Sequence, residues 1–125
     1  MATQASILAL PLDLQLMILD RLSFRDYVAF ALAGYHNLQF RHADRFPRMS
    51  QRRLRMIRSR PTFTTDPLMS LPNEMIEHIA CYVDRRTLMS WALAHYATLL
   101  HHDLVPALTM ENAGQLYLAW FRQSG

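Results

Sequence analysis

Apolar residues crowd the stretch from residue 12 to residue 22, where they cover most sides of a helix. Pro11 stands directly before this stretch, and proline suits the first position of a helix because its missing N–H costs no hydrogen bond there. A helix that is apolar nearly all round needs cover on more than one face. A small unit offers little protein for that cover, so the pattern indicates a partner.

A one-sided apolar stripe follows this first helix. Ser23 and Asp26 form a capping-box-like pair that predicts a helix start. The next apolar residues fall at i, i+3, i+4, i+7 and i+8, the spacing of one buried helix face: Phe24, Tyr27, Val28, Ala31 and Leu32. A third short helix is expected over residues 36–45, because Pro47 cannot continue it. We therefore predict a three-helix unit in residues 6–47.

The same pattern occurs a second time in the chain. Residues 10–35 lie on residues 71–96 without a gap when the sequence is shifted by 61 positions (71 minus 10). Internal self-similarity predicts one supersecondary unit used repeatedly. The matching pairs include Leu10 with Leu71, Pro11 with Pro72, Ile18 with Ile79 and Tyr35 with Tyr96.

The second unit is expected in residues 68–107. Pro72 would open its first helix, Asp84 stands at the N-cap position that Ser23 holds in the first unit, and Pro106 would end its last segment. Its apolar stripe consists of Leu88, Met89, Ala92 and Leu93. Matching caps and stripes indicate the same packing plan in both units.

Two further segments complete the predicted organisation. Residues 48–67 are interpreted as an arginine-rich linker, whose first part can be helical and whose second part is extended because of its prolines. Residues 108–125 predict a C-terminal helix with Asn112 as its cap and with Leu116, Ala119 and Trp120 on one face. The predicted fold is all-α: two small three-helix units plus a C-terminal helix.

Composition supports an all-α chain in a reducing compartment. The chain has three glycines and no alternating apolar-polar runs, which leaves little room for a sheet. Cys81 is its single cysteine, so no disulfide can form within the chain, and we expect this residue to be a small apolar core residue. The first ten residues predict neither a signal peptide nor a membrane span. We expect a cytoplasmic or nuclear protein.

Charge is concentrated in one segment. All 13 basic side chains are arginine, and residues 41–60 hold eight of them against Asp44 alone. This segment is interpreted as a solvated linker, with a nuclear localisation signal as the better functional alternative and specific nucleic-acid binding as a minor one. The candidate basic patch consists of Arg45, Arg48, Arg52, Arg53, Arg55, Arg58 and Arg60.

The sequence contains no recognisable motif for catalysis, cofactor binding or metal binding. It contains no glycine-rich phosphate loop and no Gly-x-Ser-x-Gly motif, so we expect neither an enzyme nor a cofactor. Six histidines and Cys81 invite a metal hypothesis, but no Cys-x-x-Cys or His-x-x-x-His pattern offers four ligands. We therefore expect no metal site, and the repeated helical unit favours binding over catalysis.

The repeated unit resembles the F-box, a three-helix module that docks on the Skp-type adaptor of cullin-based ubiquitin ligases. The family pattern begins with Leu-Pro-x-Glu-Leu and continues with an Ile four residues later and a Leu four beyond that. The first copy offers Leu10-Pro11-Leu12-Asp13-Leu14, Ile18 and Leu22. The second copy is similar to the F-box-like heads of fungal proteins that often carry ankyrin repeats, and offers Leu71-Pro72-Asn73-Glu74-Met75, Ile79 and Val83.

This resemblance implies a non-catalytic substrate receptor, or adaptor-binding subunit, of a cullin-based ubiquitin ligase, with an unidentified substrate. The residues that it implies for adaptor binding are Leu10, Pro11, Leu14 and Ile18 in the first copy and Leu71, Pro72, Met75 and Ile79 in the second. Two alternatives stay open. These residues can be core residues of a purely structural helical scaffold, or the chain can be a basic helical nucleic-acid-binding protein. Nucleic acid is the less expected partner, and no membrane is expected.

Overall fold

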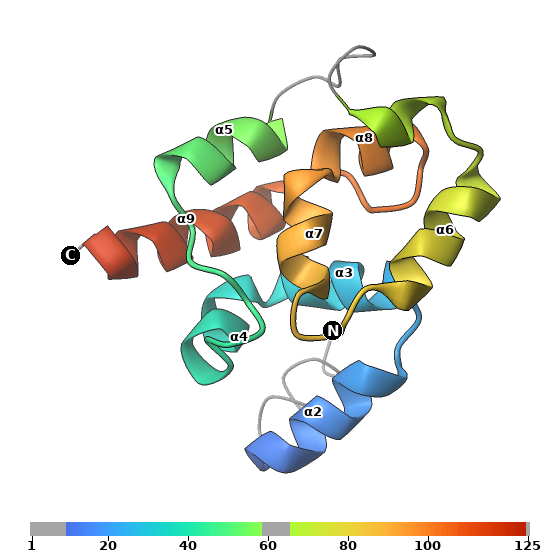
Figure 1. Cartoon of the computed structure of the whole chain (residues 1–125). Helices are drawn as coiled ribbons and strands as arrows, with labels where there is room; N and C mark the ends of the chain where they lie inside the picture. The colour runs from blue at the N-terminus through green and yellow to red at the C-terminus, as the bar shows by residue number, and fades with distance from the viewer. Residues whose placement is uncertain (1–9, 59–65, 125) are drawn as a thin grey trace.

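The computed structural model describes residues 10–58 and 66–124 and confirms the all-α class. Within these residues the chain forms eight α-helices and one short 3-10 helix, and no strand (Figure 1). The helices lie in two similar sets of three, and one further α-helix follows each set.

The first set consists of α2 (Leu12–Arg21), α3 (Phe24–Ala33) and α4 (Tyr35–Arg41). Pro11 is the N-cap of α2, and the Ser23 hydroxyl accepts a hydrogen bond from the Asp26 amide at 3.2 Å at the start of α3. The predicted cap Ser23 is therefore confirmed, whereas Pro11 lies one residue before the first helical position, which the sequence predicted for it. The predicted stripe is buried along α3 apart from half-buried Phe24: Tyr27, Val28, Ala31 and Leu32.

The second set consists of α6 (Asn73–Tyr82), α7 (Leu88–Ala94) and α8 (Tyr96–His101), with the 3-10 helix η1 (Pro67–Ser70) before it. Its predicted stripe is buried along α7: Leu88, Met89, Ala92 and Leu93.

One predicted cap of the second set is wrong. Asp84 does not cap α7; Thr87 stands at the N-cap, and the Asp84 carboxylate accepts from the Arg86 amide at 3.1 Å. A turn takes the place of the first helical turn, so α7 starts three residues after the position equivalent to the start of α3 (88 against 24 plus 61).

The helix that follows each set packs on the other set, an arrangement that we call exchanged. The predicted linker contains α5 (Gln51–Arg58), which packs on α7 and α8 of the second set. The C-terminal helix α9 (Met110–Ser124) packs on α3 and α4 of the first set (Figure 1). Each set of three helices is therefore covered by the helix that follows the other set.

Side-chain contacts hold the exchanged helices in place. Leu54 and Ile57 of α5 are buried, as are Leu116 and Ala119 of α9. The helix α9 begins two residues before the predicted cap Asn112, because the Thr109 hydroxyl accepts from the amide of that asparagine at 3.1 Å. The predicted position of the cap is thus wrong, whereas the predicted apolar face is confirmed.

Most of the buried apolar residues form one cluster that runs through both sets of helices. At the junction, the rings of Phe24 and Trp91 meet edge to face with centroids 5.8 Å apart. The Arg85 guanidinium lies over the ring of Tyr27 at 5.4 Å and donates to the Leu22 carbonyl at 3.0 Å. The two sets therefore share a core instead of folding around separate ones.

Candidate interaction surface

The Leu-Pro turn of the first set is fixed by hydrogen bonds at the start of α2. The Pro11 carbonyl accepts from the Leu14 and Gln15 amides, both at 3.1 Å. The Gln15 side chain reaches back and donates to the Leu10 carbonyl at 2.9 Å. Leu10 is half-buried and Pro11 is exposed, so the turn presents its proline at the surface.

The helix α2 has one buried side and one open side. Gln15 and Leu19 point inward, with 1% and 0% of their surface exposed. Leu14 and Met17 are 43% and 51% exposed, and Ile18 is half-buried. The apolar character of α2 on most sides therefore leaves an apolar outer face without cover from the described residues, as the sequence pattern indicated.

The predicted residues of the first copy thus differ in position. Pro11 and Leu14 lie on the open side, whereas Leu10 and Ile18 are partly covered. Met17 was missed by the family pattern, although it stands three residues after Leu14 and hence on the same helix face.

The second copy repeats this arrangement on α6. Pro72 and Met75 are exposed, Met75 to 51%, whereas Leu71 and Ile79 are half-buried and pack against the core. Ile76 is buried at the position equivalent to Gln15, 61 residues earlier. Both sets therefore present a proline and a large apolar side chain at equivalent exposed positions.

Cys81 is exposed on α6, which corrects the expectation of a core residue. The buried face of this helix is formed by Ile76 and Ala80. Cys81 is one residue past Ala80, and a step of one residue turns the side chain about 100° around the helix axis. The neighbouring Tyr82 is likewise outside, 80% exposed.

A buried polar pair, His42 and Gln15, lies on the inner side of α2. His42, 4% exposed, lies with its Nε2 atom 2.9 Å from the Gln15 Oε1 atom. Burial lowers the pKa of His42, and the nearby Arg45 guanidinium lowers it further. The ring therefore favours its neutral form, and its Nε2–H donates to the Gln15 amide oxygen.

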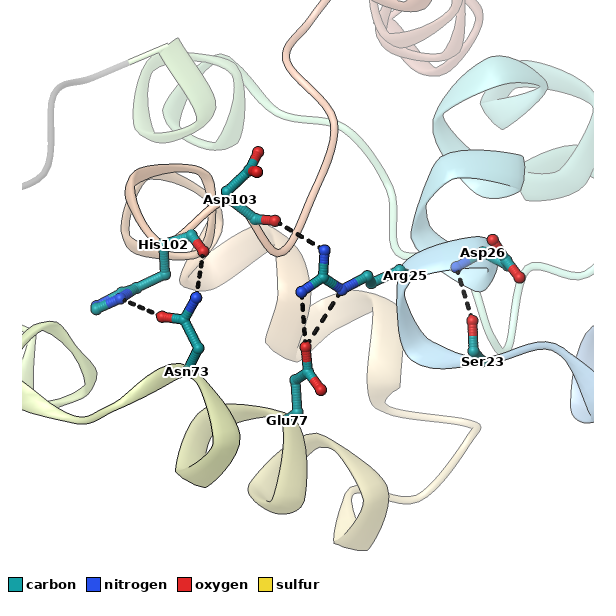
Figure 2. Close-up of polar contacts among 7 residues, drawn as sticks. All are labelled: Ser23, Arg25, Asp26, Asn73, Glu77, His102 and Asp103. Carbon is teal, nitrogen blue, oxygen red and sulfur yellow. Dashed lines mark hydrogen bonds and ion pairs between the residues drawn. The ribbon is translucent and has the colours of Figure 1, made fainter.

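Polar contacts at the surface join the two sets of helices. Figure 2 shows Arg25 of α3 between Glu77 of α6 and the carbonyl of Asp103, with distances of 2.7 Å from Nη2 to Glu77 Oε1 and 3.1 Å from Nη1 to the carbonyl. Nearby, the Asn73 amide donates to the His102 carbonyl at 2.9 Å. The Arg25 contacts orient α6 relative to α3, and the Asn73 contact holds α6 against the end of α8.

The predicted basic patch divides into two parts. Arg45 forms an ion pair with Asp20 of α2, so its charge supports that helix. Arg52, Arg53, Arg55 and Arg58 all belong to α5, and Arg48 precedes it. The Arg53 guanidinium donates to the Arg48 carbonyl at 2.8 Å. Arg60 lies outside the described residues.

Two general properties of the described residues bear on function. Their histidine, cysteine and acidic side chains form no group of three or more that could hold a metal ion. None of the helices within residues 10–58 and 66–124 has the length and apolarity that crossing a membrane requires.

Comparison with known family models finds a similarity over a short stretch near the start of the chain. The model of the F-box domain matches residues 7–32, a stretch that contains the Leu-Pro turn, α2 and nearly all of α3. Searches of curated proteins and of solved structures found no match. F-box domains are in general non-catalytic protein-interaction modules that bind Skp-type adaptors in cullin-based ubiquitin ligases. The stretch that contains α2 and nearly all of α3 is thus similar to this interaction module.

Proposed function

We propose that this chain is an adaptor-binding subunit of a cullin-based ubiquitin ligase, and that the outer face of α2 is its docking surface. The observation that carries the proposal is the F-box match over residues 7–32 together with the exposure of Pro11, Leu14 and Met17 on that stretch. The chemistry lies in other subunits, and this chain contributes binding.

Energetics favour this surface as a docking site. Full burial of a leucine or methionine side chain is worth about 1.5–3 kcal/mol before ordering costs. Leu14 and Met17 keep about half of that surface exposed in the free chain. Gln15 and the Asp20–Arg45 ion pair hold α2 in place, so little ordering is needed when a partner covers it.

The second set of helices is, in this proposal, a further F-box-like unit. Its helices follow the same order, and Pro72 and Met75 stand 61 positions after Pro11 and Leu14. We assign it a structural role, because Leu71 and Ile79 pack against the shared core. This division of labour follows the scaffold interpretation for one unit and the adaptor interpretation for the other.

Co-purification of the full chain with a Skp-type adaptor tests the proposal. We expect wild type to retain the adaptor and Leu14→Asp to lose it, because a carboxylate would have to be desolvated at the centre of the interface. Met75→Asp is the matched control: it places the same charge at the equivalent exposed position of α6 and should leave retention unchanged.

Folding is checked for each variant by far-UV circular dichroism, since both positions are exposed. A wild-type chain that is folded but does not retain the adaptor contradicts the proposed function. Retention by Leu14→Asp would show that the outer face of α2 is not the docking surface.

A further inference from the structure

A groove with a volume of about 380 Å³ lies between α5 and α9. Leu54, buried, and the half-buried rings of Tyr117 and Trp120 give it an apolar floor. The exposed side chains of Gln51, Arg55 and Arg58 form its polar edge. The groove exists only because α5 and α9 lie side by side in the exchanged arrangement (Figure 1).

Arg58 is held in place at the edge of the groove. Its guanidinium donates to the Tyr117 hydroxyl, and its Cζ atom lies 5.9 Å from the centre of the same ring. Tyr117 also borders a small apolar hollow that Leu108 and Leu116 line. A fixed cation thus stands directly beside apolar surface, which is the arrangement that an amphipathic ligand needs.

The charge of this surface is strongly positive. The helix α5 carries four arginines and no acidic residue, and the acidic residue in the first turn of α9 is Glu111. Arg52 and Arg55 are exposed and form no hydrogen bond or ion pair with other described residues. Of the two, Arg55 lines the groove, so its guanidinium is available there for an anionic partner.

We propose that the groove between α5 and α9 binds an acidic peptide segment of another protein. An aliphatic or aromatic side chain of the segment would lie on Leu54 and Trp120, while its carboxylates reach Arg55 and Arg58. Planar guanidinium groups match carboxylates in bidentate geometry, and the groove has room for one or two side chains. The segment must therefore combine acidic residues with at least one large apolar residue.

A nucleic-acid strand fits this surface less well. Single-stranded nucleic acids bind along extended tracks where successive bases stack on open aromatic rings. Here Arg58 already lies over the ring of Tyr117, and the Trp120 ring contacts Phe121 with centroids 5.1 Å apart. Apolar floor and cationic edge together favour a peptide.

The groove is separate from the proposed adaptor surface. Figure 1 places α5 on the opposite side of the molecule from α2. Both surfaces can therefore be occupied at once. Identifying the acidic segment with the protein that a ligase modifies rests on the proposed function, whereas the binding itself does not.

Fluorescence anisotropy on the full chain tests the peptide site. The probe is a labelled peptide in which two central leucines are flanked by glutamates. Three comparison probes isolate the contributions: the leucines replaced by serine, the glutamates replaced by glutamine, and a single-stranded DNA oligonucleotide. We expect the first peptide to bind tightest, and its affinity to fall as salt is raised.

Two arginine variants locate the site. Arg55→Gln removes a guanidinium at the groove and should weaken the peptide about tenfold, the loss expected for a charge-assisted hydrogen bond. Arg52→Gln is the matched control, because Arg52 belongs to the same helix and is exposed but does not line the groove. It should change the affinity less than about threefold.

Several outcomes would overturn the proposal. Equal losses in Arg52→Gln and Arg55→Gln would indicate diffuse attraction without a groove. Equal affinity for the leucine and serine peptides would show that the apolar floor does not contribute to binding. Tighter binding of the oligonucleotide, with displacement of the peptide, would assign α5 to nucleic acid. None of these results depends on whether the adaptor is retained, so the two proposals can fail separately.

Discussion

Tyr96 holds in the second set of helices the place that Tyr35 holds in the first. The two residues stand 61 positions apart, and both are buried. Each donates its hydroxyl to the carbonyl of a later proline, Tyr35 to Pro47 and Tyr96 to Pro106. In both sets this bond ties the segment after the third helix back to that helix. The repeat therefore extends beyond residues 71–96 to the way each set ends.

Removing the Tyr96 hydroxyl should destabilise the whole chain. Burial raises the pKa of Tyr96 to about 12, so the hydroxyl stays protonated and donates at neutral pH. Tyr96→Phe leaves the Pro106 carbonyl without this donor, which should lower the free energy of unfolding by about 1–3 kcal/mol. Urea unfolding followed by circular dichroism measures the loss.

Tyr82→Phe provides the control for this experiment, because Tyr82 is 80% exposed on α6. It should change the free energy of unfolding by less than about 0.5 kcal/mol. Equal stability of wild type and Tyr96→Phe would mean that the hydrogen bond to Pro106 contributes nothing to the fold.

Acidification should destabilise the chain through His42. Burial lowers the pKa of His42 in the folded chain, whereas the unfolded chain titrates near the ordinary value of about 6.5. Below about pH 6.5 the unfolded state takes up a proton that the folded state binds only at lower pH. The stabilisation is thus present at neutral pH and lost as the pH falls, by up to about 1.4 kcal/mol per pH unit.

Urea unfolding between about pH 7 and pH 5 measures this slope. His42→Gln should flatten it, because glutamine does not titrate in that range. The control is His78→Gln, since His78 is exposed on α6. An unchanged slope in His42→Gln would contradict the assignment.

Asp66 anchors the second set of helices with a carboxylate. It accepts from Thr98 at 2.6 Å, contacts His95 Nδ1 at 2.8 Å and accepts from the Leu68 amide at 3.0 Å. Burial acts to raise the pKa of Asp66, but these hydrogen bonds outweigh it and hold the pKa below its usual value. The stabilisation is therefore present above about pH 4 and is lost as the pH falls through the folded pKa.

Asp66→Asn should lower the free energy of unfolding by about 1–3 kcal/mol at neutral pH, because charge-assisted hydrogen bonds become neutral ones. Thermal unfolding at neutral and acidic pH measures the effect. Once the wild-type carboxyl is protonated, the difference between the two proteins should shrink. A difference that is the same at both pH values would show that the charge of Asp66 is not the cause.

Local structure followed from the sequence because it depends on neighbouring residues. The stripe through Tyr27 and Leu32 and the cap at Ser23 are set by helical spacing and by one hydroxyl. The exposure of Cys81 and Met17 was predictable in principle from the register of α6 and α2. Residue type and the family pattern do not carry this information, whereas position on the helix does.

Long-range packing could not be predicted in the same way. The apolar side of α5, Leu54 and Ile57, indicates that the helix is covered but not which helices cover it. The groove at Arg55 depends on α9 lying beside α5, two segments about sixty positions apart in the chain. No spacing within either helix encodes that contact, so this candidate site emerged only from the structure.

The exchange of α5 and α9 predicts that the two sets of helices unfold together. Each set depends on the helix that follows the other, so loss of either helix uncovers part of the shared core. Leu54→Ala and Leu116→Ala remove buried side chains from α5 and α9, and each should cost about 2–5 kcal/mol. Leu118→Ala is the control, because Leu118 is 49% exposed on α9.

Unfolding is followed by tryptophan fluorescence, which reports on Trp91 and Trp120, and by far-UV circular dichroism. Trp91 belongs to α7 of the second set, and Trp120 belongs to α9, which packs on the first set. The two rings therefore report on both sets of helices. We expect one transition with coincident midpoints, shifted in both buried variants and nearly unchanged in the control. Separate transitions would mean that each set of helices folds without the helix that the other provides.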